Sequence, residues 1–360
     1  MPENGVERRP TVMQRLSLSI IMLQIIGPFW YWPLAIFLCW KSHFFCALMT
    51  GYIIYIFFLD NKRHKRPEGD APIRRLKFWR HLAEYFPAKL IKTGELDPQR
   101  NYIFCAHPHG VCCFSHVAHF LTEATGFSDT FKGINIYPLL LDAHFFAPFH
   151  REIAHLSGFK GASKGAILNL LTSRKAGTSV LLIPGGASEA LKSQPGHYDL
   201  IIKKRKGFVR MALQTGASLV PVMAFGETSL FQIKSPAPGS LVDRIQKLVK
   251  RLTGFAIPVL EGDGFWYGAK VLLLLPRCLP VTTIVGAPLH VSKWEGDVNN
   301  NPSFDSAVDK LHEEYCKALQ QLWVEHKDKY APRAPEGATG RAALTDGRVC
   351  FRRKSLDFVA

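Results

Sequence analysis

Two histidines on one short turn are the residues of this sequence best suited to acid–base chemistry. His107 and His109 lie in the sequence His-Pro-His-Gly, which directly follows the apolar run 102–106. Imidazole titrates near neutral pH and is the usual general base in enzymes. Pro108 stiffens this turn and Gly110 lets the backbone bend sharply, so both imidazoles are held close together. The alternative is a polar surface turn with two solvated histidines.

Glycines and a carboxylate follow two later apolar runs in a similar way. The run 179–184 is followed by Gly185, Gly186 and Glu189, and the run 218–225 by Gly226 and Glu227. Glycines let a backbone approach a ligand closely, and a carboxylate at a strand end can take part in catalysis. Plain turns are the alternative at both places.

A basic cluster precedes one of the expected helices. It consists of Lys203, Lys204, Arg205 and Lys206. Basic side chains and free N–H groups at a helix start together favour an anion such as phosphate. A solvated basic face would have the same composition.

Other chemistries have weaker support in the sequence. His116 and His119 have the i, i+3 spacing of a helix, but no carboxylate lies beside them and no H-E-x-x-H motif is present, so no metal site is expected. Cys112 or Cys113 could be a nucleophile near a histidine, although buried structural thiols are more common. None of the eight cysteines forms a C-x-x-C pair.

Alternating strand-like and helix-like segments must position these residues. Such alternation predicts an α/β domain with a largely parallel sheet, whose ligands bind at the carboxyl ends of the strands. The expected strands are 102–106, 179–184, 218–225 and 282–286, and the expected helices 111–125, 163–173, 206–215, 240–252 and 304–326. The apolar stripe of the last helix, which includes Tyr315, is typical of core packing.

The N-terminal quarter has the composition of a membrane anchor. Two uncharged apolar runs, 16–40 and 44–59, have basic residues on both outer sides. The first run is long enough for a hydrocarbon core of about 30 Å. The positive-inside rule then predicts a hairpin with both ends in the cytosol, and two buried helices of a soluble protein are the alternative. The expected units are a cytosolic segment 1–15, a transmembrane or re-entrant hairpin 16–60, a basic amphipathic membrane-surface segment 61–100, a catalytic domain 101–331 and a mostly disordered tail 332–360.

Composition narrows the range of partners. The chain of 360 residues is 47% hydrophobic and 21% charged, which fits a folded protein, and its formal net charge is +16. A net positive charge of this size indicates that the protein binds nucleic acid, an anionic membrane surface or a phosphate-bearing substrate. The apolar N-terminal runs favour the membrane, so no nucleic-acid partner is expected.

Five motifs, in order over about residues 14–331, resemble the type-2 diacylglycerol acyltransferase family, which includes monoacylglycerol and wax-alcohol acyltransferases. The motifs are Tyr85-Phe86-Pro87, His107-Pro108-His109-Gly110, Pro184-Gly185-Gly186-Ala187-Ser188-Glu189, Arg205-Lys206-Gly207-Phe208 and Val220-Pro221 with Phe225-Gly226-Glu227. The resemblance implies a layered glycerolipid-acyltransferase-like domain behind the membrane hairpin. It also implies an endoplasmic-reticulum enzyme with a cytosolic catalytic domain, associated with lipid droplets.

The implied reaction moves a fatty acyl group from acyl-CoA, a co-substrate, to a neutral-lipid hydroxyl without a further cofactor. Diacylglycerol is the expected acceptor, with monoacylglycerol or a fatty alcohol as alternatives. A membrane-anchored lipid-binding protein without catalysis is the alternative outside the enzymes. The sequence leaves a homo-oligomer open.

The resemblance also suggests roles for the candidate residues. His107 by preference is the general base, and His109 or backbone N–H groups at Gly110 and beyond stabilise the oxyanion. Related glycerolipid acyltransferases have His-x-x-x-x-Asp, but here the Asp position holds Cys112 or Phe114. Glu189 is therefore the candidate partner of the imidazole, with Glu227 in reserve. Gly185 and Gly186 would contact substrate, and the cluster Lys203, Lys204, Arg205 and Lys206 would bind the phosphates of CoA.

Overall fold

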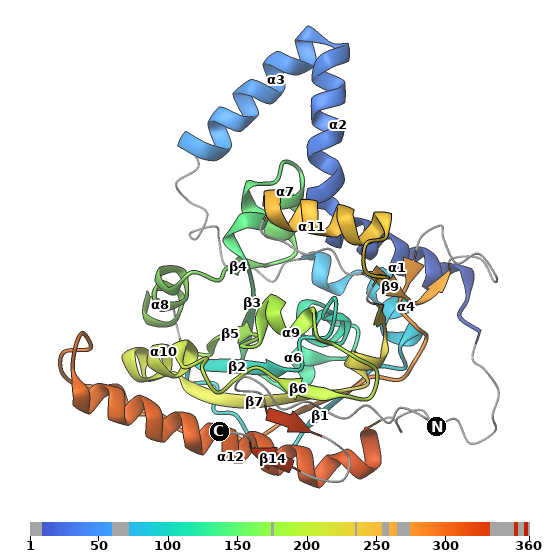
Figure 1. Cartoon of the computed structure of the whole chain (residues 1–360). Helices are drawn as coiled ribbons and strands as arrows, with labels where there is room; N and C mark the ends of the chain where they lie inside the picture. The colour runs from blue at the N-terminus through green and yellow to red at the C-terminus, as the bar shows by residue number, and fades with distance from the viewer. Residues whose placement is uncertain are drawn as a thin grey trace.

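The computed structural model describes residues 9–59, 72–173, 176–234, 236–253, 259–264, 274–331, 349–351 and 356–358. Its centre is a mixed α/β domain, and Figure 1 shows helices on both sides of the central sheet. The N-terminal helices α2 and α3 project from this domain.

The central sheet has seven strands and is mostly parallel. Strands β7, β2, β5, β3 and β4 run in one direction, and the edge pair β1 and β12 runs in the other. Their spatial order is β1 (Lys89–Lys92), β12 (Thr282–Val285), β7 (Ser218–Phe225), β2 (Tyr102–His107), β5 (Thr178–Leu182), β3 (Asn135–Leu140) and β4 (Lys160–Gly161). The four strands expected from the sequence are thus confirmed, each to within two residues at either end.

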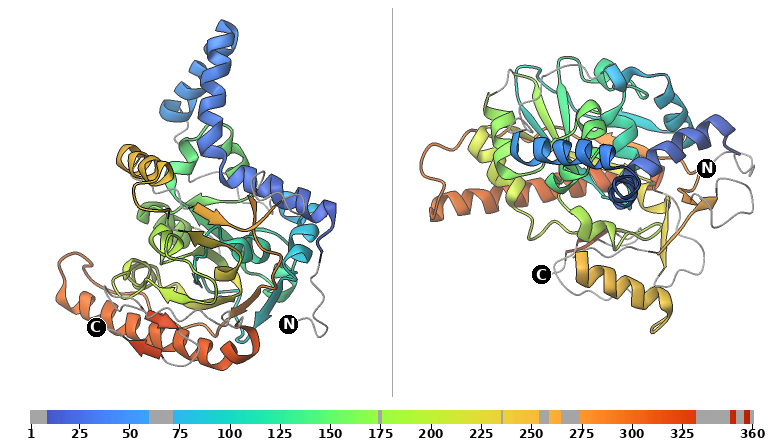
Figure 2. Two further views of the ribbon diagram at one scale, coloured as in Figure 1. Left: turned by 45° about the vertical axis from the view of Figure 1, so that its right-hand side comes forward. Right: turned by 90° about the horizontal axis from the view of Figure 1, so that it is seen from above.

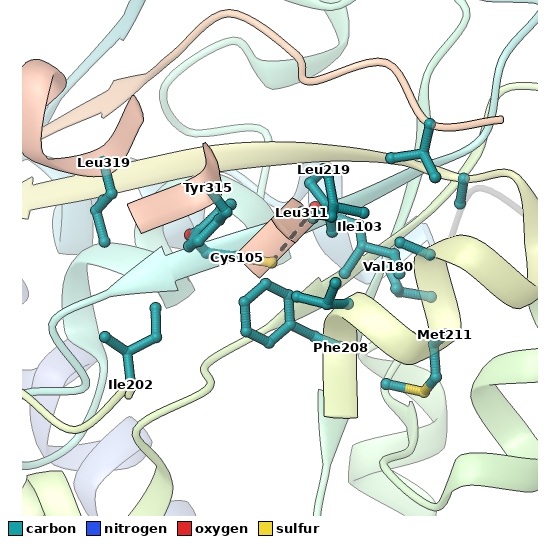
Figure 3. Packing of buried hydrophobic residues seen from close by; sticks show 14 of the residues in the cluster. Ile103, Cys105, Val180, Ile202, Phe208, Met211, Leu219, Leu311, Tyr315 and Leu319 are labelled. Atoms are coloured by element: carbon teal, nitrogen blue, oxygen red, sulfur yellow. Dashed lines mark hydrogen bonds between the residues drawn. The ribbon is translucent and has the colours of Figure 1, made fainter. Parts of the chain in front are cut away.

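Strand β2 is buried along its whole length because helices cover both faces of the sheet. Successive side chains point to opposite faces. Ile103 and Cys105 face a core formed with α8 (Lys164–Ser173), α10 (Gly207–Thr215) and α12 (Pro302–Tyr330), as Figure 3 shows in part. Tyr102, Phe104 and Ala106 face a second apolar cluster that contains Phe120 and Phe127. By the same alternation, His107 lies on the α12 face.

The first apolar run of the sequence is two helices and not one. Helix α1 (Val12–Ile25) and the apolar helix after it meet at a bend of 74°. This second helix is α2 (Gly27–Lys41). Together with α3 (His43–Ile54) it makes the projecting hairpin, and the π-helical turn η1 (Tyr55–Leu59) extends α3. In the described residues, no single helix is both long and apolar enough to cross a membrane, whereas the bent pair together has the required length and composition.

Helix α1 lies along the α/β domain (Figure 2). Leu18, Ile21 and Met22 pack in one apolar cluster with Leu82 and Tyr85 of α4 (Phe78–Tyr85). The opposite side of α1 is exposed and apolar, at Val12, Met13, Leu16, Ile20 and Leu23. The short helical turn η2 (Pro72–Arg75) precedes α4, so the basic segment expected at the membrane surface is described from residue 72 onward.

Several other segments complete the domain. Helix α11 (Leu241–Thr253) was expected and exposes Leu241, Val242, Ile245 and Leu248. The helix expected over 111–125 is instead a short turn, α5 (Phe114–His116), continued by the π-helical η3 (Val117–Leu121).

The tail expected to be disordered contains strands β13 (Val349–Phe351) and β14 (Leu356–Phe358), and β13 pairs with β6 (Tyr198–Leu200). Its other residues lie outside the described part. The remaining elements are α6 (Phe127–Thr130), η4 (Asp142–Phe146), α7 (His150–Leu156), α9 (Gly186–Ala190), η5 (Glu227–Ser229), β8 (Gln232–Lys234), β9 (Val259–Glu261), β10 (Asp263–Gly264) and β11 (Leu274–Leu275).

Candidate active site

Three neighbouring strands deliver the candidate residues to one edge of the sheet. Strand β2 ends at His107, and its neighbours β5 and β7 are parallel to it on either side. The segments after these neighbours carry Glu189 in α9 and Glu227 in η5. Because carboxyl ends of parallel strands meet at one edge, the two carboxylates flank the His-Pro-His-Gly turn.

The imidazole of His109 is oriented by the main chain of the turn. Its Nδ1 lies 3.0 Å from the carbonyl oxygen of Gly110. A carbonyl oxygen only accepts hydrogen bonds, so Nδ1 carries the proton and Nε2 keeps its lone pair. The side chain is partly exposed, and burial lowers the pKa of this imidazole. The neutral, proton-accepting form of His109 is therefore the dominant one at pH 7.

Glu189 holds the backbone of the turn and not an imidazole. Its Oε1 accepts the backbone N–H of His109 at 2.6 Å, and its Oε2 accepts the N–H of Ile201 at 3.0 Å. Burial raises the pKa of this carboxyl to about 7, although both backbone hydrogen bonds act in the opposite direction. A Cβ on Gly185 would collide with the Glu189 side chain, so the glycine provides the space for the carboxylate. Gly186 has a positive φ of 57°, which favours glycine there for a different reason.

Glu227 holds the next part of the chain in the same manner. Its two oxygens accept the backbone N–H groups of Phe114, at 3.1 Å, and Ser115, at 2.8 Å. Burial raises its carboxyl pKa to about 7. Gly110, with a φ of 60°, packs against the Glu227 side chain so closely that a Cβ would overlap it. The two carboxylates thus fix the turn from both sides through main-chain contacts.

His107 has a different environment from His109. It has no exposed surface, and its Nε2 lies 3.0 Å from the hydroxyl of Tyr315 on α12. That hydroxyl also donates to the carbonyl oxygen of Cys105 at 3.3 Å. Burial lowers the pKa of the His107 imidazole to about 3. These contacts join α12 to the end of β2 and leave His107 inaccessible in this structure.

The other histidines near the turn are also buried, and Cys112 and Cys113 are partly buried. The Nε2 of His116 lies 3.0 Å from the carbonyl oxygen of Pro108, so this imidazole donates to the turn. His119 contacts the hydroxyl of Thr125 at 3.0 Å. Burial raises the pKa of the Cys112 thiol to about 12 and that of Cys113 well above its usual value. Thiolate nucleophiles are disfavoured by this environment.

The basic cluster follows β6 and is only partly free to bind an anion. The Nζ of Lys206 lies 2.6 Å from Oδ1 of Asp309 on α12, and the side chains of both residues are exposed to solvent. Lys203 is partly exposed, whereas Lys204 and Arg205 are exposed. The positive charge of Arg205 opposes the rise that burial causes in the Glu189 carboxyl pKa, so Arg205 lies close enough to interact with this carboxylate.

A narrow cleft lies beside the turn, between Gly110, Glu189, His197 and Thr228. Its volume is about 10 Å³, room for roughly one water molecule. A fatty acyl chain needs far more space than this. This cleft is thus too small to hold a fatty acyl chain.

Sequence reasoning identified the turn and both carboxylates but missed the positioning contacts. Tyr315 belongs to an apolar helical stripe, and nothing in that stripe signals that its hydroxyl reaches His107. His116 was considered only as a metal ligand. Both glutamates accept hydrogen bonds from backbone N–H groups. Almost every residue has such a group, so the sequence cannot show which ones the carboxylates contact.

Comparison with known proteins shows the family of this chain. The family described as diacylglycerol acyltransferase matches residues 37–336. Acyl-CoA wax alcohol acyltransferase 2 of Homo sapiens is 42% identical over 72% of this chain and 75% of its own length. Diacylglycerol O-acyltransferase 2A of Umbelopsis ramanniana is 39% identical over 78% and 77%. The 2-acylglycerol O-acyltransferase 3 of Homo sapiens is 36% identical over 86% and 88%.

Among solved structures, the 1-acyl-sn-glycerophosphate acyltransferase PlsC of Thermotoga maritima covers 78% of this chain and 97% of its own. Its TM-score is 0.36 and its identity 14%. The family match spans most of the chain, including the whole His-Pro-His-Gly turn. The chain belongs to the diacylglycerol acyltransferase family and is an acyltransferase.

Proposed function

We propose that this protein transfers a fatty acyl group from acyl-CoA to the free hydroxyl of diacylglycerol, forming triacylglycerol. Family membership and the names of three relatives support an acyl-CoA-dependent O-acyltransferase of acylglycerols or wax alcohols. The observation that carries the mechanism is the position of His109, a partly exposed residue whose Nδ1–H is fixed by the Gly110 carbonyl.

In this mechanism His109 Nε2 takes the proton of the acceptor hydroxyl. The acceptor oxygen then attacks the thioester carbonyl carbon, and backbone N–H groups at Gly110 and beyond stabilise the oxyanion. The C–S bond breaks, and the CoA thiolate leaves with the proton from His109. Because His107 has no exposed surface and its Nε2 bonds to Tyr315, it is assigned a positioning role here, in place of the base role preferred from the sequence.

The two substrates are proposed to bind through different parts of the protein. Lys203, Lys204 and Arg205 bind CoA phosphates from the cytosolic side, close to Glu189, and Lys206 contributes after it leaves Asp309. The apolar N-terminal helices keep the neutral acceptor in reach at the endoplasmic-reticulum membrane and at lipid droplets. A homo-oligomer is compatible with this arrangement.

The acceptor is tested with purified full-length protein, radiolabelled acyl-CoA and a panel of monoacylglycerol, diacylglycerol and fatty alcohol. Diacylglycerol should give the highest kcat/KM. A clear preference for either other acceptor would assign the chain to that activity. Lipid binding without turnover of any acceptor would support the non-enzymatic alternative.

The base is tested by His109→Ala and His107→Ala in the same assay. Loss of a general base costs about 10²–10⁴-fold in rate. His109→Ala should show such a loss in kcat with an unchanged melting temperature. His107→Ala should lower the melting temperature because it opens a cavity beside Tyr315. Near wild-type turnover by His109→Ala would exclude His109 as the base.

A further inference from the structure

The side chain of Cys113 lies directly against the imidazole of His109. Its sulfur is 3.4 Å from Nδ1 and 3.7 Å from Nε2 of this ring. The two nitrogens flank one ring carbon, so a sulfur atom in the ring plane at these distances would overlap that carbon. The sulfur therefore lies off the plane, against one face of the imidazole. In this position it restricts rotation of the ring and does not itself cover the in-plane lone pair of Nε2.

The thiol proton of Cys113 has a partner of its own. Burial raises the pKa of this thiol well above its usual value, so the group stays protonated at pH 7. The S–H group donates to the backbone carbonyl oxygen of His109 at 3.2 Å. The Nδ1–H of His109 is bound to the carbonyl oxygen of Gly110 at 3.0 Å. Thiol and imidazole are thus held by adjacent carbonyl groups of the main chain, and neither hydrogen bond uses Nε2.

The backbone of Cys113 has a conformation that normally favours glycine. Its φ is 58° and its ψ is 33°, in the left-handed region. A residue with a Cβ is disfavoured there, because the Cβ comes too close to the following carbonyl oxygen. Contacts on both sides keep this backbone in place: the Cys113 carbonyl accepts the N–H of Val117 at 2.9 Å, and Glu227 accepts the N–H of Phe114. The direction of the side chain is therefore fixed.

Strain at this position indicates that the side chain has a function. Residues in sparsely populated backbone conformations cluster at active sites, where the surrounding structure holds them. A glycine at position 113 would remove the strain, but it would also remove the sulfur that lies on the His109 ring. A nucleophilic role is disfavoured, because the raised thiol pKa leaves little thiolate. The contact with the imidazole is the role that remains.

We propose that Cys113 is a positioning residue, whose thiol holds the His109 imidazole in the orientation that proton transfer requires. The proposal rests on the proposed function, in which His109 is the general base. The thiol also has an electrostatic effect on this base. Burial lowers the pKa of the His109 imidazole, and the sulfur is part of the protein that covers the ring.

The test uses purified full-length protein with radiolabelled acyl-CoA and acceptor, and kcat, KM and the melting temperature are measured for each variant. The site variant is Cys113→Gly, because glycine adopts a φ of 58° without strain. The variant Cys113→Ala removes the same sulfur but keeps the Cβ. The matched control is Cys112→Ala, which removes the neighbouring thiol, a group that packs against the apolar cluster containing Phe114.

Both Cys113 variants should lose about tenfold in kcat with little change in the KM for acyl-CoA, since the base is less well oriented. The variant Cys113→Gly should melt at or above the wild-type temperature. The acidic limb of its kcat/KM profile should move to higher pH, because water reaches the ring and the pKa of His109 rises toward its usual value. A merely structural role would not move this limb. The control should keep the wild-type kcat and pH profile.

A double variant separates this inference from the proposed function. If Cys113 acts through His109, adding Cys113→Gly to His109→Ala should cause no further fall in kcat. A further tenfold fall in the double variant, or full kcat in Cys113→Gly alone, would overturn the role of Cys113 and leave the base assignment intact. Near wild-type turnover by His109→Ala would instead overturn the base assignment, and the positioning role with it.

Discussion

Replacing Glu189 by glutamine gives a direct test of how the catalytic turn is held. The carboxylate accepts two backbone N–H groups, those of His109 and Ile201, one on each oxygen. A glutamine amide has only one accepting oxygen, so its NH₂ group would face the other N–H. One buried donor is then unsatisfied, at a cost of about 1–3 kcal/mol. If the His109 position relaxes in response, kcat falls by roughly 5- to 150-fold, at about 1.4 kcal/mol per tenfold.

The assay compares kcat, the KM for acyl-CoA and the melting temperature of Glu189→Gln with those of Asp199→Asn. Asp199 lies beside the same cleft and undergoes the same chemical change, but its side chain makes no hydrogen bond to the turn in the described residues. We expect a fall in kcat with little change in KM for Glu189→Gln, and near wild-type values for Asp199→Asn. Full turnover by a normally folded Glu189→Gln would refute the reasoning, and an inactive Glu227→Gln beside it would transfer the role to Glu227.

Three further changes test the remaining parts of the site. Gly110→Ala should lower the melting temperature and activity together, because the new Cβ meets Glu227 at a positive φ; unchanged melting would contradict the close packing. The double variant Lys203→Ala with Lys204→Ala should have a severalfold higher KM for acyl-CoA and a nearly unchanged KM for the acceptor. If this variant instead detaches from lipid vesicles while its KM for acyl-CoA stays constant, the cluster binds the membrane and not CoA. Burial lowers the pKa of His119 to about 3, so the contribution of its neutral form to stability is present above pH 6.5 and is lost as the pH falls. The variant His119→Gln should therefore show a smaller fall in melting temperature than the wild type between pH 6.5 and 5. An identical fall in the two proteins would refute this.

The sheet was predictable because its central strands are uninterrupted apolar runs. Strands β2, β5 and β7 are buried on both faces, which removes the alternation of polar residues and makes a short run conspicuous. The edge strand β1 is Lys-Leu-Ile-Lys, too short and too charged to stand out from the basic segment that precedes it. Strand β12 runs antiparallel to β7, and nothing in its own residues indicates this direction.

The positions of the catalytic candidates were also predictable, but their partners were not. The rule that parallel strands end at one edge brings His109, Glu189 and Glu227 together without any knowledge of contacts. Which atoms meet depends on side-chain direction. Glu189 reaches the main chain two residues beyond His107, and the hydroxyl of Tyr315 reaches His107 from a helix more than two hundred residues away. Distances of this kind are fixed by tertiary packing alone.

The packing of α1 has a consequence for the biosynthesis of the protein. Leu18, Ile21 and Met22 share one apolar cluster with Phe114, at the start of the helix that follows the catalytic turn, and with Leu275 and Val281. The first of these residues leave the ribosome more than two hundred residues before the last, so the cluster closes only when synthesis is nearly complete. Until then the apolar side chains of α1 lack this cover. A domain made without α1 would therefore lack part of its core, so we expect such a truncation to fold poorly.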